Sequence, residues 1–170
     1  MNLKISGLGH GIHYFDFSGP VEELDLDELF VGTYKLDLKL DRSVAQILLT
    51  TKLALTGKFF CDRCGQEYLR EVLTEFKTAF HFTRPNEIGD DDEDYKLLNF
   101  DADKIDISQE LKDYSSLAIP LKNLCSEECQ GLCPKCGKNL NVEKCDCVIE
   151  NINPIWSPLA ELKEKFNNNK

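Results

Sequence analysis

Several features that would mark a membrane, secreted or catalytic protein are missing from this 170-residue sequence. No uninterrupted apolar run is long enough to cross a bilayer, and the start, MNLKISGLGHGIHYF, has no basic segment followed by an apolar one. We therefore expect a cytoplasmic protein. A phosphate-binding glycine loop, a serine nucleophile elbow and a His-Glu-x-x-His motif are also absent. The sequence thus predicts a protein without enzyme activity and without a small-molecule substrate.

Positive charge is in short supply as well. The chain has 20 lysine and arginine residues against 30 aspartate and glutamate residues, which gives a formal net charge of −10. A field of this sign disfavours binding of RNA over a broad surface, so only a local basic patch or a basic protein partner is compatible with it. Part of the acidic charge falls in a loop at residues 86–94. We interpret this loop as a solvated linker or, alternatively, as a docking strip for a basic partner.

Long runs of alternating apolar and polar residues are present, and they predict β-strands. The segment YKLDLKLD at residues 34–41 places an apolar side chain at every second position, the pattern of a half-buried strand. The same period continues over residues 45–60 and over residues 67–82. The positions predicted to face the core are Tyr34, Leu36, Leu38, Leu40, Ile47, Leu49, Leu53, Leu55, Tyr68, Val72, Phe76, Phe80 and Phe82. The elements before residue 33 are short, and the sequence does not define them.

Eight cysteines stand out, and six of them fall within CSEECQGLCPKCGKNLNVEKCDC at residues 125–147. A reducing cytosol disfavours disulfides, so an even number of cysteines there indicates metal ligation. CDRCG at residues 61–65 and CPKCG at residues 133–137 share the pattern Cys-x-x-Cys-Gly. In such a knuckle a tight turn directs two sulfur atoms at one ion, and the glycine supplies a positive φ. The sequence therefore predicts Zn²⁺, as one or two ions.

Each knuckle needs two further ligands for tetrahedral zinc. The favoured grouping has one set of Cys133, Cys136, Cys145 and Cys147 and another of Cys61, Cys64, Cys125 and Cys129. Closing the roughly 60-residue loop of the latter set costs only about 2 kcal/mol more, whereas a structural zinc supplies about 10 kcal/mol. Two alternatives stay open. In one, Cys125 and Cys129 join the neighbouring knuckle, which leaves Cys145 and Cys147 to Cys61 and Cys64. In the other, only one ion binds and the remaining cysteines stay as thiols.

Helical spacing appears between the last strand and the cysteines. A helix is predicted over residues 106–119, with Asp106 as its cap and Gln109 completing a capping box. A second, short helix is predicted in NPIWSPLAELKEKF near the C-terminus. The expected fold is α+β: an antiparallel β-sheet or partly closed barrel with about two principal helices and a C-terminal zinc ribbon. The expected division is a β-rich N-terminal domain over residues 1–120 and a cysteine-rich region over residues 121–170.

The order of these features resembles the YceD family of large-subunit ribosomal RNA accumulation proteins. The likeness covers roughly residues 30–166, and its most specific parts are GLCPKCGKNLN at residues 131–141, the CDC motif that follows, and NPIWSPLAEL. The resemblance implies a non-catalytic factor that supports accumulation of the large-subunit (23S) ribosomal RNA and assembly of that subunit. Its implied partners are the pre-ribosomal large-subunit RNA or a large-subunit ribosomal protein.

Three lysines give the best local basic patch for such a contact. Lys135, Lys138 and Lys144 all lie on the predicted ribbon, and they are our candidates for RNA binding. The alternative is that they are ordinary solubilising lysines. Two other functions stay open, a protein adaptor that holds a basic client and a thiol oxidoreductase. The second is less favoured, because the strand-like flanks of Cys61 do not provide the helix N-terminus that stabilises a redox thiolate.

Overall fold

The computed structural model describes residues 1–83 and 96–147, and these residues form two compact units. The first unit consists of residues 1–61, 66–83 and 96–125, and the second consists of residues 62–65 and 126–147. The predicted acidic loop and the predicted C-terminal helix lie outside the described residues. None of the helices in the described part has the length and apolar character needed to cross a membrane.

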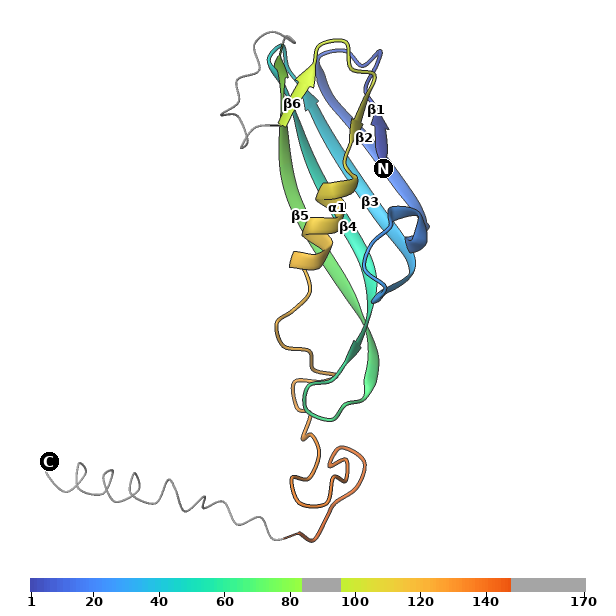
Figure 1. Ribbon diagram of the computed structural model, residues 1–170, viewed down its shortest axis with the longest axis vertical. Helices are drawn as coiled ribbons and strands as arrows, with labels where there is room; N and C mark the ends of the chain where they lie inside the picture. The colour runs from blue at the N-terminus through green and yellow to red at the C-terminus, as the bar shows by residue number, and fades with distance from the viewer. Residues whose placement is uncertain (84–95, 148–170) are drawn as a thin grey trace, which may run out of the picture. The chain divides into compact units, whose positions relative to one another are not determined.

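A five-stranded sheet dominates the first unit (Figure 1). Across the sheet its strands are β2 (Gly11–Pro20), β3 (Phe30–Arg42), β4 (Gln46–Phe60), β5 (Glu67–Thr83) and β6 (Lys96–Asn99). The first four run antiparallel to their neighbours, whereas β6 joins β5 in parallel. The three strands predicted from the alternating pattern are confirmed as β3, β4 and β5. A separate antiparallel pair is formed by β1 (Asn2–Lys4) and β7 (Lys104–Asp106).

One face of the five-stranded sheet carries the hydrophobic core. The side chains predicted to face inward are buried or pack against the core, and Leu36, Leu40 and Ile47 are fully buried. Burial of one such side chain contributes about 1.5–3 kcal/mol. The helix α1 (Ser108–Leu117) lies over this face, and the ring of Tyr114 stacks on that of Phe76 with centroids 4.0 Å apart. The single-sided core explains why charged residues alternate so regularly with apolar ones.

Two features of the sheet differ from the sequence prediction. The sheet is open, with β2 and β6 at its edges in the described part of the chain, so the alternative of a partly closed barrel is wrong. The strand β2 escapes sequence prediction because Tyr14 faces outward while Phe15 and Phe17 are only half-buried. Aromatic residues on both faces remove the alternation of polarity on which the prediction depends.

The helix α1 confirms the predicted position but starts differently. It begins at Ser108, two residues after the predicted cap. Asp106 Oδ1 accepts the backbone N–H of Ser108 at 3.0 Å, so this carboxylate still satisfies one helix-start donor. The capping box is not formed, because Gln109 Nε2 donates forward to Asp113 Oδ1 at 2.8 Å. A short 3₁₀ helix, η1 (Val21–Leu24), completes the helical content of the described residues.

Candidate metal centres

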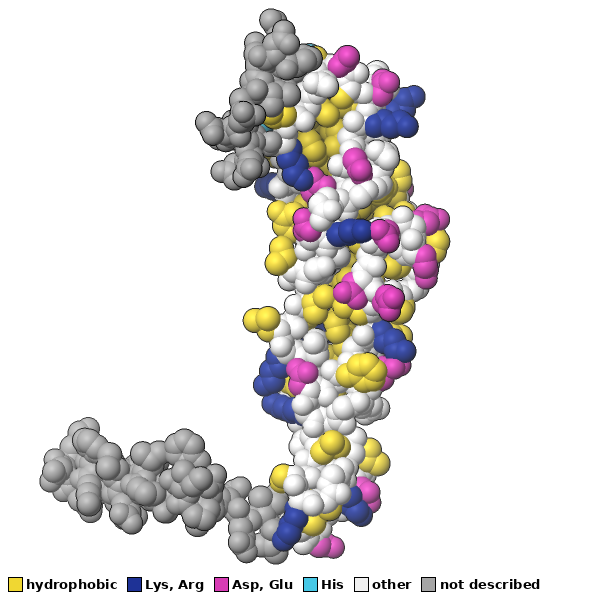
Figure 2. Space-filling view, in the orientation of Figure 1, with side chains coloured by type: hydrophobic (Ala, Val, Ile, Leu, Met, Phe, Trp, Pro, Cys, Tyr) yellow, Lys and Arg dark blue, Asp and Glu magenta, His cyan; other side chains and the backbone are white. Residues whose placement is uncertain are grey.

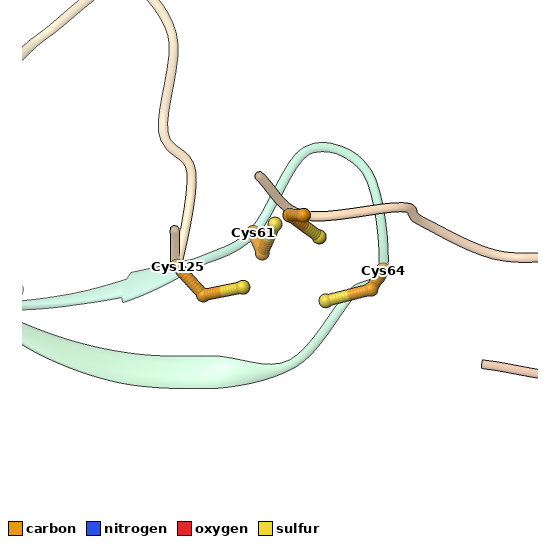
Figure 3. Close-up of side chains that lie close together, drawn as sticks. Cys61, Cys64 and Cys125 are labelled. Carbon is orange, nitrogen blue, oxygen red and sulfur yellow. The ribbon is translucent and has the colours of Figure 1, made fainter. Parts of the chain in front are cut away.

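The first cysteine set comprises Cys61, Cys64, Cys125 and Cys129. Cys61 directly follows β4, and Cys64 lies in the turn that leads to β5. Figure 3 shows the side chains of Cys61, Cys64 and Cys125 pointing toward one another. All four sulfur atoms lie within 4.8 Å of one another. Three of these residues are buried and Cys125 is partly exposed, so the set is largely shielded from solvent.

The second cysteine set comprises Cys133, Cys136, Cys145 and Cys147, whose sulfur atoms also lie within 4.8 Å of one another. In a tetrahedral zinc site with sulfur ligands about 2.3 Å from the ion, the sulfur atoms are about 3.8 Å apart. Each set therefore needs at most a small contraction to enclose an ion. The structure brings together the two groups of four cysteines that the sequence favours. In the described residues, the alternative grouping of Cys125 and Cys129 with the second knuckle is not formed.

The two knuckles share one local geometry. The backbone N–H of Cys61 donates to the carbonyl of Gln66 at 2.9 Å, and that of Cys133 donates to the carbonyl of Lys138 at 2.8 Å. Gly65 and Gly137 follow their second cysteines with φ of 68° and 75°, so the predicted positive φ is confirmed in both. Equal spacing in the sequence thus produces the same tight turn twice.

The second cysteine set holds its thiols in unequal electrostatic environments. Backbone N–H groups of Cys136 and Lys135 lower the pKa of Cys133 to about 6. The hydrogen bond with Cys136, together with burial, raises the pKa of Cys147 to about 12. The N–H of Cys147 acts to lower the pKa of Cys145, but the nearby Cys133 and burial outweigh it, so this pKa is raised as well. Four thiolates in so small a volume need a compensating positive charge, which a divalent cation supplies.

Arg63 is a structural residue of the site that sequence reasoning does not identify. It lies inside the first knuckle, and its Nη1 donates to the carbonyls of Glu127 and Cys129 at 3.1 and 2.7 Å. Its own carbonyl accepts the N–H of Leu132 at 3.2 Å. These hydrogen bonds connect residues 127–132, which include Cys129, to the first knuckle. The position of an arginine between the two cysteines is the only signal in the sequence.

The three lysines proposed for RNA contact are all exposed, but their surroundings differ. Lys138 forms an ion pair with Glu143 at 3.2 Å, which reduces its value as a phosphate ligand. Lys135 lies between Cys133 and Cys136, and Lys144 directly precedes Cys145. On the face shown in Figure 2, acidic and basic side chains are interspersed over the described residues. This face therefore shows no broad basic area.

Comparison with known proteins gives one family match. The family model described as "Large ribosomal RNA subunit accumulation protein YceD" matches residues 49–163. This range includes both cysteine sets. No solved structure shows significant similarity to the chain.

Individual relatives agree with this match over parts of their length. An Arabidopsis thaliana protein, "Large ribosomal RNA subunit accumulation protein YCED homolog 1, chloroplastic", is 30% identical over 131 residues, covering 62% of this chain and 41% of the relative. The Zea mays protein of the same name is 44% identical over 75 residues, covering 42% of this chain and 25% of the relative. An uncharacterized Mycobacterium tuberculosis protein is 28% identical over 129 residues, covering 75% and 60%. The chain thus spans less than two thirds of each of these relatives.

Proposed function

Because the chain belongs to the YceD family of large ribosomal RNA subunit accumulation proteins, we propose that it is a non-catalytic factor in the biogenesis of the large ribosomal subunit. It supports accumulation of the large-subunit ribosomal RNA and assembly of that subunit in the cytoplasm. The family match over residues 49–163 carries this proposal. The cysteine sets support the non-catalytic part, since a tetrathiolate zinc site leaves no coordination position for water or substrate.

Zinc has a structural role in this proposal, with one ion in each cysteine set. The described residues of the second unit contain no helix, and their β-structure is a single bridge between Leu132 and Asn139. Such a segment buries too little apolar surface to fold by itself, whereas a structural zinc supplies about 10 kcal/mol or more. Metal analysis of the purified chain should find two zinc ions. Metal-free protein with a titratable low-pKa cysteine would favour the thiol oxidoreductase instead.

The surface that meets the precursor is proposed to include Lys135 and Lys144, with Lys138 as a weaker contributor. Three phosphate contacts give a slope of log affinity against log salt of only about −2 to −3, so part of the affinity comes from a ribosomal protein or from RNA shape.

Sedimentation of cell lysate tests this surface. We expect Lys135→Glu with Lys144→Glu to reduce co-sedimentation with precursor large subunits, while zinc content stays unchanged. Lys39→Glu with Lys77→Glu is the matched control, because it makes the same change of charge on exposed positions of β3 and β5. Equal co-sedimentation of both variants across a range of salt would show that the ribbon does not face the RNA.

A protein adaptor is the second candidate function, and the net charge of −10 favours it. An acidic chain attracts a basic client, and many ribosomal proteins are basic. Ultraviolet crosslinking in cells separates the two functions. The assembly factor should recover large-subunit ribosomal RNA above background, whereas the adaptor should recover only a basic protein.

A further inference from the structure

A side-chain amide connects the ribbon to a ligand of the first cysteine set. Asn141 Nδ2 donates to the sulfur of Cys129 at 3.3 Å. Asn141 Oδ1 accepts the backbone N–H of Gln130 at 2.7 Å. The second bond fixes the orientation of the amide, because a flipped amide would place its NH₂ group against another donor. The N–H of Asn141 is therefore directed at the sulfur.

The loop that carries Asn141 is held by its own hydrogen bonds. Asn139 Oδ1 accepts the backbone N–H of Asn141 at 3.0 Å and its Nδ2 at 2.8 Å. The N–H of Leu140 donates to the carbonyl of Gly131 at 2.9 Å. Residues 139–141 lie between Cys136 and Cys145 of the second cysteine set. The position of Asn141 therefore depends on the loop that the second set closes.

We infer that Asn141 is a positioning residue that orients the sulfur of Cys129 through this hydrogen bond and so raises the metal affinity of the first cysteine set. This role rests on the proposed metal binding. The hydrogen bond fixes where the sulfur of Cys129 lies, so this ligand is already placed when the ion binds. Outer-shell partners of this kind change metal affinity by about 10–100-fold. Because Asn141 is exposed, we expect a value near the low end.

The same contact couples the two cysteine sets. A metal ion in the second set would close the loop that contains residues 139–141 and would so restrain the Asn141 amide that donates to Cys129. Filling of the second set should then increase the affinity of the first. By linkage, filling of the first set should increase the affinity of the second by the same factor.

Cobalt(II) titration of the full chain tests the role of Asn141. Asn141→Asp keeps an acceptor for Gln130 but removes the N–H donor, and Asn141→Ala removes both groups without adding charge. Asn139→Asp is the control for Asn141→Asp. It adds the same negative charge two residues away and keeps the acceptor oxygen for Asn141. In both Asn141 variants we expect one of two ions to bind about tenfold more weakly by chelator competition. The sulfur-to-cobalt charge-transfer band of the more weakly bound ion should move to lower energy, because the sulfur of Cys129 loses the hydrogen bond from Asn141.

The outcomes separate this inference from the metal proposal. Unchanged affinity and an unchanged band in Asn141→Ala would overturn the role of Asn141 while leaving metal binding intact. An equal effect in Asn139→Asp and Asn141→Asp, with no effect in Asn141→Ala, would assign the loss to charge and would also overturn it. A wild-type chain that binds no cobalt or zinc would overturn the metal proposal itself, together with the inference. If Asn141→Asp does not fold, Asn141→Ala decides the result.

Discussion

Among single residues, Gly131 is the position in the ribbon with the strictest requirement. Its φ is +76°, and a Cβ built on it would lie 3.0 Å from the carbonyl oxygen of Arg63. A residue other than glycine costs about 1–2 kcal/mol in this left-handed region. The close approach matters as well, since the adjacent Leu132 N–H donates to that same oxygen. Both the backbone conformation and the available space therefore require glycine.

Gly131→Ala should weaken zinc binding by about tenfold, because a strain of about 1–2 kcal/mol falls on the folded, metal-loaded state. Competition with a chromogenic chelator measures this change. Gly9→Ala is the control, because Gly9 has no positive φ and no atom lies within 4 Å of the position that a Cβ would take there. Equal zinc retention in the two variants would contradict the account of Gly131.

A single residue's role can be predicted from the sequence only when its interaction partners are close in the sequence. The glycines after the two knuckles are predictable, because the turn itself demands a positive φ. Arg63 and Asn141 are not, because their partners at Cys129 lie 66 and 12 residues away. A pattern of spacing does not show which carbonyl or sulfur atom a distant side chain will meet.

At the scale of elements, strands with one buried face are the most predictable part of this fold. In β3, β4 and β5 every second side chain enters the core, so burial leaves a period of two in the sequence. The short β6 leaves no such pattern, and its parallel pairing with β5 involves only four pairs of residues. Edge strands bury less surface, and their sequences are correspondingly less constrained.

The start of α1 gives a prediction about pH. Hydrogen bonds from the side chain and backbone of Ser108, together with the N-terminal ammonium group, lower the pKa of Asp106 to about 2. In the unfolded chain this pKa is about 3.9. The folded state therefore binds the proton less readily, so the charged carboxylate stabilises the fold above about pH 4. This stabilisation is lost as the pH falls toward 2.

Asp106→Ala should lower the free energy of unfolding by about 1 kcal/mol at pH 7, the usual cost of losing a helix-start acceptor. Urea denaturation of wild type and variant should show this difference shrinking as the pH falls from 4 toward 2. Asp106→Asn keeps an acceptor oxygen and should lose less stability than Asp106→Ala at pH 7. A difference that stays constant down to pH 2 would show that the charge of Asp106 has no part in stability.

At the scale of the whole molecule, an acidic chain carries two cysteine knuckles that could each hold a metal ion. The sheet buries a large hydrophobic core, whereas the described part of the second unit has no helix and carries cysteines that could hold metal. The net charge of −10 confines any contact with RNA to a small basic area. Family membership cannot be derived from such physics, and it comes from the motif GLCPKCGKNLN and its surroundings.

The central claim is tested most directly by the ratio of large-subunit to small-subunit ribosomal RNA in cells that normally make this chain. We expect the ratio to fall when the chain is removed and to return with the wild-type sequence. Cys136→Ser should not restore it, because loss of one ligand removes the folding energy of the second cysteine set. A ratio that is unchanged in cells lacking the chain would contradict the account.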